Sequence, residues 1–221
     1  PTFKQPEVRM MLSAFAAMEA VHQEAYSLLL ETLGFRDDEY QKFFEHKEML
    51  DKHEYLGNFG METPMDIAKT MAIYSAFTEG VQLFSSFAIL LNFPRHNLMK
   101  GMGQIVTWSV RDETLHVEGM SHLFRSFVQE NPELWTDDLK YEIYCAAERT
   151  VELEDAFINL CFEGAEVPDL TAEEIKEYIR YIADRRLLGL GLKKIFGSEA
   201  NPLPWLDYML NGVEHTNFFE N

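Results

Sequence analysis

Apolar residues recur at helical spacing along almost the whole chain, and no segment alternates between apolar and polar residues as a strand does. The spacing predicts a helix over residues 7–33 that ends at Gly34, since glycine suits the position after a helix. Residues 37–53 are charged with a thin apolar stripe, which predicts a second, more exposed helix. The chain is therefore expected to be an all-α bundle of long helices and short loops.

Capping residues mark the start of the next helix. Thr63 can cap it, Pro64 suits its first turn, and Asp66 places an acid in that turn. This helix is expected to run to about Asn92 and to end before Pro94, because proline disfavours a helical residue before it.

Three further helices are predicted, over residues 95–129, 136–162 and 171–188. The last of them opens with a capping box, Thr171-Ala-Glu-Glu174. The tail, residues 197–221, reads as rich in loops. Together these segments predict a single helical domain over residues 1–221.

The net charge limits the classes of partner that are expected, and the cysteines indicate a cellular compartment. A net charge of −18 disfavours binding to nucleic acid or to an anionic membrane surface, because both would repel the chain. Its two cysteines, Cys145 and Cys161, have no metal or redox spacing, which fits a reducing, cytoplasmic location.

Residues 71–93 are long and apolar enough to span a bilayer. However, Glu79 and Gln82 near their middle favour a helix buried in protein, and no membrane association is expected.

Two Glu-x-x-His pairs, Glu19/His22 and Glu113/His116, lie in strongly apolar helical segments. This spacing puts a carboxylate and an imidazole on one helix face, close enough to share a metal ion. Glu79 adds a carboxylate in the middle of the most hydrophobic segment. A buried lone carboxylate is costly, so three in one bundle suggest a common positive charge. The set predicts a dinuclear metal centre of the ferritin-like type, for which iron or manganese is suited.

Other acids and histidines are expected to have ordinary structural roles. Glu148, Glu152 and Glu154 are predicted to form a solvated face, with Glu152 kept as a weak ligand candidate. The remaining histidines lack a Glu three residues earlier in an apolar helix, so they are not counted as ligands.

Three strings along the chain carry a family resemblance: "MEAVHQEAY", "RDETLH" and a tail that contains "NPLPW" followed by "TNFFE". In this order they resemble the small (beta) subunit of class I ribonucleotide reductase over essentially the whole chain. The resemblance implies a homodimeric ferritin-like bundle with a dinuclear centre of iron, manganese or both metals. That centre would use oxygen to form a tyrosyl radical, which passes to the large (alpha) subunit for reduction of ribonucleotides to deoxyribonucleotides.

The resemblance also assigns roles to residues. The metal ligands would be Glu19, His22, Glu79, Glu113 and His116. Tyr26 occupies the position of the radical tyrosine, and Leu83 and Phe87 are expected to line the apolar pocket around it. Asp112 resembles the acid that hydrogen-bonds a ligand histidine on the radical-transfer route.

Some features of the family have no counterpart in the chain. The family uses a further carboxylate ligand and a transfer-route tryptophan from a helix before "PEVRM", whereas the only acid upstream of Glu19 is Glu7. It also has a flexible tail beyond "TNFFEN" that docks on the large subunit. We therefore expect an internal fragment, incomplete at both ends, that by itself binds metal weakly and is inactive.

Two other functions remain open on the sequence. A different ferritin-like oxidase or hydroxylase would use the same ligands, but it would need a substrate cavity over the metals. An iron-storage or purely structural bundle is the second alternative. Tyr26 and the tail motif favour the reductase subunit over both.

Overall fold

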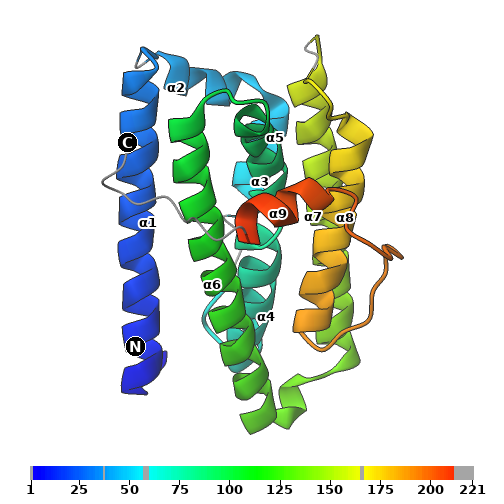
Figure 1. Cartoon of the computed structure of the whole chain (residues 1–221). Helices are drawn as coiled ribbons and strands as arrows, with labels where there is room; N and C mark the ends of the chain where they lie inside the picture. Colours follow the sequence, from blue (N-terminus) through cyan, green and yellow to red (C-terminus); the bar gives the residue numbers. More distant parts are fainter. Residues whose placement is uncertain (1, 37, 57–59, 165–166, 212–221) are drawn as a thin grey trace.

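The computed structural model is built almost entirely from helices (Figure 1). It describes residues 2–36, 38–56, 60–164 and 167–211, and within these ranges no strand is present. The α-helices are α1 (Pro6–Thr32), α2 (Glu39–Lys42), α3 (Lys47–Leu56), α4 (Pro64–Ile73), α5 (Phe84–Arg95), α6 (Lys100–Glu130), α7 (Asp137–Phe162), α8 (Ala172–Gly189) and α9 (Pro204–Asn211). Two 3-10 turns, η1 (Phe43–Glu45) and η3 (Pro132–Leu134), and a π-helix, η2 (Tyr74–Glu79), complete the list. The all-α prediction is confirmed.

The predicted helix starts are realised by capping hydrogen bonds. Thr63 caps α4 and Thr171 caps α8, each in a complete capping box with the acid three residues later. Thr136 caps α7, where its hydroxyl accepts the Leu139 N–H at 3.1 Å. Gly34 follows α1 with a φ of +78°, the left-handed conformation that glycine adopts without strain.

The prediction of one helix over residues 37–53 is wrong. The segment divides into α2, η1 and α3, and His46 has extended backbone angles between the last two. This break lets α3 pack against α7, where Lys52 forms an ion pair with a buried carboxylate, Glu154. The tertiary contact therefore decides a boundary that the charged sequence pattern does not reveal.

Three other boundaries differ from the prediction. The helix from Pro64 is interrupted by η2 and a turn at residues 80–83, and it continues through Pro94 to Arg95. The following helix begins at Lys100 rather than residue 95, after a left-handed residue at Met99. The described part of the tail contains α9, and the "TNFFE" motif lies outside the described residues.

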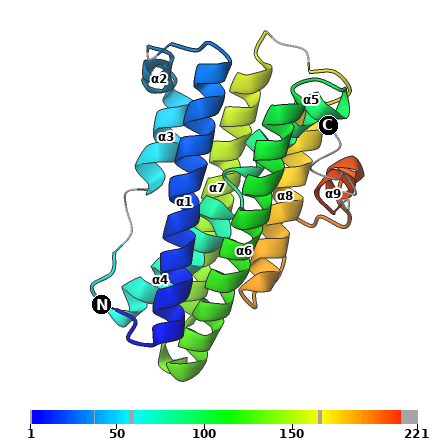
Figure 2. The ribbon, with the colours of Figure 1, turned by 60° about the vertical axis from the view of Figure 1, so that its left-hand side comes forward.

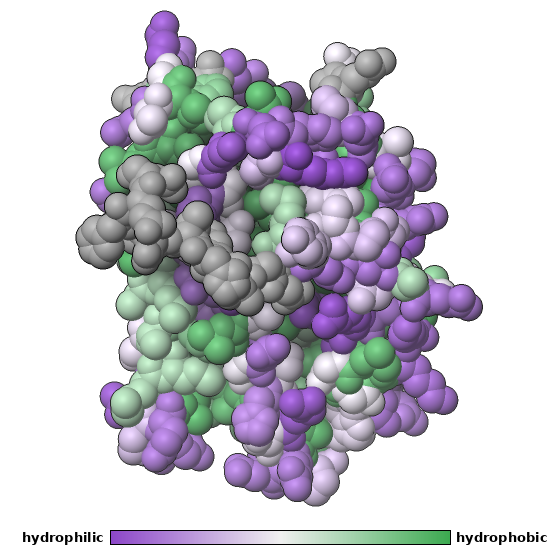
Figure 3. Space-filling view, viewed as in Figure 1, coloured by the Kyte–Doolittle hydropathy of each residue, from purple (hydrophilic) through white to green (hydrophobic). Residues whose placement is uncertain are grey.

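The long helices run roughly parallel and antiparallel to one another (Figures 1 and 2). The apolar core lies between α4, α5, α6, α7 and α8, whose inward side chains form one cluster. Helix α1 lies beside α6 at the edge of the bundle, and none of its side chains is fully buried. Hydrophobic residues are visible over α1 in the space-filling view, whereas the surface over α8 is mostly hydrophilic (Figure 3).

The apolar run predicted to be a core helix is central in the structure. Within the described residues, Pro64–Arg95 is the one stretch long and apolar enough to cross a membrane, and 67% of its most apolar window is buried inside the fold. Its inward residues include Ala72, Phe77 and Leu91, each fully buried. A stretch covered in this way by other helices is typical of a protein core.

Candidate metal centre

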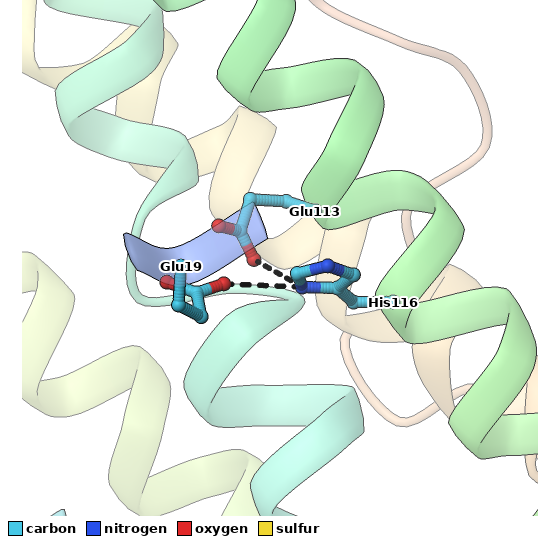
Figure 4. Close-up of side chains that lie close together, drawn as sticks. All are labelled: Glu19, Glu113 and His116. Carbon is cyan, nitrogen blue, oxygen red and sulfur yellow. Dashed lines mark ion pairs between the residues drawn. The ribbon is translucent and has the colours of Figure 1, made fainter. Parts of the chain in front are cut away.

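The two Glu-x-x-His pairs meet where α1 crosses the middle of α6. Nδ1 of His116 lies 3.2 Å from Oε1 of Glu19 and 3.7 Å from Oε2 of Glu113, as Figure 4 shows. Nδ1 of His22 lies 3.6 Å from Oε2 of Glu19 and 3.5 Å from Oε1 of Glu113. Each carboxylate therefore faces both imidazoles, and one oxygen or nitrogen from each of Glu19, Glu113 and His116 lies within 4.8 Å of the others.

The outer nitrogen of each imidazole has its own partner. Nε2 of His22 lies 3.0 Å from Oδ2 of Asp112, a distance typical of a charge-assisted hydrogen bond. Nε2 of His116 lies 3.4 Å from the Met18 sulfur, and its ring packs on Phe15 with centroids 4.3 Å apart. These contacts orient both rings so that Nδ1 points into the centre.

Glu79 reaches the same region from a different element. It is the last residue of η2, and it lines a cavity of about 520 Å³ together with Glu19 and Glu113. Burial, followed by the charge of Glu19, raises the pKa of Glu79 to about 7. The structure thus brings the three predicted carboxylates to one cavity.

Glu113 has the most strongly perturbed carboxyl group of the three. Burial and the nearby charges of Glu19, Glu79 and Asp112 raise its pKa to about 8. Burial also lowers the pKa of His116, which favours the neutral ring that binds metal. Like charges crowded together without a counter-charge are costly, and a bound cation would remove that cost.

The donor set fits a divalent metal. Oε1 of Glu19 and Oε2 of Glu113 are buried and make no hydrogen bond among the described residues. Buried carboxylate oxygens without donors are unusual, and a cation is the partner that such atoms prefer. Three carboxylates and two imidazoles match the ligand types used by iron and manganese.

Tyr26 lies one helical turn beyond His22 on α1, and its hydroxyl donates to Oγ of Ser109 at 3.1 Å. Burial is the main cause that raises its pKa. Phe87 is buried in the core, and Leu83 is 38% exposed and lines the cavity beside Glu79. The pocket role of these two residues stays a prediction.

One part of the predicted solvated face is buried. Glu154 has no exposed surface, whereas Glu152 is exposed and pairs with Arg149 at 3.1 Å. Glu154 instead accepts a hydrogen bond from the Ser85 hydroxyl and forms an ion pair with Lys52 at 2.5 Å. The signal that reveals it is its helical register, because it lies four residues after a buried position, Thr150, and four before another, Ile158.

Comparison with known proteins identifies the family of the chain. The family described as "Ribonucleotide reductase, small chain" matches residues 1–202. A probable ribonucleoside-diphosphate reductase small subunit of Invertebrate iridescent virus 3 is 47% identical over 99% of this chain and 63% of its own length. The ribonucleoside-diphosphate reductase subunit beta of Chlamydia pneumoniae is 32% identical over 97% of this chain and 65% of its own. The chain therefore belongs to the ribonucleotide reductase small-chain family, and it spans about two thirds of the length of these relatives.

Solved structures share the fold. The ribonucleotide reductase R2 subunit from Clostridium botulinum superimposes with a TM-score of 0.85 at 22% identity, covering 92% of this chain and 67% of that one. The dimanganese(II) NrdF of Streptococcus sanguinis gives 0.79 at 22% identity, covering 94% of this chain and 72% of that one. These likenesses confirm the predicted ferritin-like bundle.

Proposed function

We propose that the protein is the radical-generating small subunit of a ribonucleoside-diphosphate reductase. The observation that carries this proposal is a pair of buried carboxylate oxygens without hydrogen bonds, Oε1 of Glu19 and Oε2 of Glu113, which both face Nδ1 of His116. The other oxygen of each carboxylate faces Nδ1 of His22. Glu79 faces the same cavity, and Tyr26 lies one turn away along α1. Membership of the small-chain family supports the reaction, in which a large subunit reduces ribonucleotides to deoxyribonucleotides.

The centre would hold a dinuclear cofactor of iron, manganese or one of each. Glu19, Glu79, Glu113, His22 and His116 would be its ligands from this chain. When bound, these metals supply activation of oxygen and one-electron oxidation of a nearby phenol. The dimanganese centre of the Streptococcus sanguinis neighbour makes manganese a natural first metal to test.

Within this mechanism, residues of the chain orient the groups that react. Oxidation of Tyr26 would release its hydroxyl proton to a carboxylate of the centre, because the Ser109 hydroxyl is not a base. The Tyr26 hydroxyl donates to Oγ of Ser109 at 3.1 Å, which sets its direction. Ser109 in turn donates to the Ile105 carbonyl at 3.1 Å, which fixes the direction of its lone pairs. Asp112 holds His22 with Nδ1 toward the centre. These contacts prepare the tyrosine for oxidation without large rearrangement.

The partners and the location are proposed by analogy with the family. We propose a homodimer that pairs with a large alpha subunit in the cytoplasm and needs neither nucleic acid nor a membrane. The exposed apolar residues Met10, Val21 and Leu28 on the outer face of α1 are consistent with a surface that becomes covered in the assembled protein. The whole of residues 1–221 is proposed to form one domain.

A metal-binding measurement on the natural full-length protein tests this proposal. Purified apoprotein is titrated with Mn²⁺ or Fe²⁺, and the bound metal is counted; two ions per chain are expected. E113Q should lose at least one of them, whereas E118Q, an exposed control on the same helix, should bind as the wild type does. Exposure of the iron-loaded or manganese-loaded protein to its oxidant should give a tyrosyl radical by electron paramagnetic resonance. No metal binding in the wild type would refute the proposal.

The cavity beside the carboxylates favours a second candidate, a ligand-binding oxidase or hydroxylase of the same fold. Its volume of about 520 Å³ is enough for a small organic substrate. This function predicts that the metal-loaded protein oxidises a bound molecule and yields no tyrosyl radical. The same resonance experiment separates the two functions.

A further inference from the structure

The turn that follows Glu79 is held by cations from two other helices. Arg186 of α8 donates from Nε to the Gly80 carbonyl at 2.9 Å, and Lys52 of α3 donates from Nζ to the Gln82 carbonyl at 3.0 Å. Both carbonyls lie in residues 80–83, which connect η2 to α5 and which we name the ligand turn. Buried backbone carbonyls outside the regular helical hydrogen-bond pattern need other donors. Here the side chains of Arg186 and Lys52 are those donors.

The α-helical hydrogen-bond pattern is interrupted in η2, and it does not resume in the ligand turn. The N–H groups of Val81 and Gln82 both donate to the Phe77 carbonyl, at 3.1 and 3.0 Å. The Phe84 N–H donates to the Val81 carbonyl at 3.0 Å, which closes a tighter turn. Since the α-helical pattern is interrupted on both sides of Glu79, the direction of its side chain depends on what fixes the turn.

Lys52 is itself held firmly. Its ammonium pairs with Glu154 of α7 at 2.5 Å and lies 4.2 Å from the centre of the Phe157 ring. Glu154 is fully buried and also accepts from the Ser85 hydroxyl on α5. The ion pair thus connects α3 and α7 to the ligand turn, at Gln82, and to the first turn of α5, at Ser85. A buried ion pair contributes little net stability by itself, so its placement suggests a role in fixing geometry.

Arg186 connects α8 to the ligand turn independently of Lys52. Its guanidinium packs over the Phe84 ring at 5.1 Å, at the first residue of α5. Burial lowers the pKa of Arg186 to about 10, so that it stays protonated at neutral pH. Two cations, one from α3 and one from α8, therefore hold two carbonyls of the same short turn.

We propose that Lys52 and Arg186 are positioning residues for the metal centre, which hold the carbonyls of the ligand turn and so direct the Glu79 carboxylate into the cavity. The inference rests on the proposed metal site. The first part of the proposal, that Lys52 and Arg186 fix the ligand turn, can be measured without metal.

The first test compares Mn²⁺ affinities in the natural full-length protein. The variant K52M/E154Q removes the donor to the Gln82 carbonyl without leaving a buried carboxylate unpaired. The control E154Q removes the ion pair but keeps Lys52. We expect K52M/E154Q to bind Mn²⁺ about tenfold more weakly than E154Q, as is usual for residues that orient a metal ligand. Adding E79Q should abolish this difference, because Lys52 acts through Glu79. Equal affinities of K52M/E154Q and E154Q would overturn the proposal.

The second test follows amide hydrogen exchange of residues 80–86 in the metal-free protein. Exchange should be faster in K52M/E154Q than in E154Q, and faster in R186M than in R185M, while the core of α7 stays protected. Arg185 is the matched control because it is exposed and contacts the Tyr181 ring instead of the turn. If K52M/E154Q does not fold, the arginine pair decides the outcome. Unchanged exchange contradicts the proposal, whereas a wild type that binds no Mn²⁺ contradicts the proposed function instead.

Discussion

Asp112 on α6 lies 3.0 Å from Nε2 of His22 on α1, so that a carboxylate of one helix orients an imidazole of the other. The two residues are adjacent in space although 90 positions separate them in the chain. Because Asp112 occupies Nε2, the ring presents Nδ1 to Glu19 and Glu113. The contact thus selects which nitrogen is available as a metal ligand.

Removal of this contact should weaken metal binding. In D112A, the His22 ring loses its acceptor and can turn away from the centre, so we expect Mn²⁺ affinity to fall about 10- to 100-fold. The control E118A removes an equal charge from an exposed site on the same helix. Titration followed by electron paramagnetic resonance of free Mn²⁺ gives both affinities. Equal losses in the two variants would mean that the effect is only electrostatic.

Tyr26 is expected to carry the radical. Phenylalanine at this position has no hydroxyl to oxidise, so the radical signal of the metal-loaded, oxidised protein should disappear in Y26F. In the control Y141F, which alters a tyrosine that is 69% exposed, the signal should persist. S109A should slow radical formation, since it removes the group that accepts the Tyr26 hydrogen bond. A radical of wild-type intensity in Y26F would exclude this assignment.

The metal-free protein should lose stability as pH rises from 6.5 to 8.5. Glu79 and Glu113 have folded-state pKa values of about 7 and 8, above the usual 4.5, so the native state holds more protons than the unfolded state in this window. The lowered pKa of His116 acts in the opposite direction, but mainly at the acidic edge of this window. Glu113 alone should reduce the free energy of unfolding by about 2 kcal/mol.

Urea denaturation at several pH values in the presence of a chelator measures this change. E113Q should flatten the profile, because the amide does not titrate. Saturating Mn²⁺ should reverse the slope, since metal binding favours the deprotonated carboxylates. A metal-free protein that becomes more stable over the same window would contradict the raised pKa values.

Gly80 should not tolerate a side chain. A Cβ atom at this position would lie 2.2 Å from the Ala76 carbonyl oxygen and 2.9 Å from Nε of Arg186. We expect G80A to lower the free energy of unfolding by about 1–3 kcal/mol, as overpacked sites do. G101A is the matched control, because a Cβ there meets no atom within 4 Å and alanine favours the α6 helix. Chemical denaturation compares the two, and equal stability would show that the ligand turn can shift.

Much of the fold is encoded locally. Helix starts at Thr63, Thr136 and Thr171 follow from side-chain caps, and the end of α1 follows from Gly34. Such signals act between residues a few positions apart, so they can be recognised without tertiary structure. The Glu-x-x-His pairs are equally local, which is why both were recognisable as candidate ligands.

The rest depends on contacts between distant segments. Glu154 lies in helical register with buried positions of α7, but its partners, Lys52 and Ser85, come from α3 and α5 and cannot be read from that register. The interruption after Glu79 is fixed by donors from α3 and α8. The sequence by itself determined the all-α class, the capped helix starts and the types of ligand, because these depend on local spacing. The tertiary structure decided which nitrogen of each histidine faces the centre and what holds Glu79, because those depend on partners brought together only by folding.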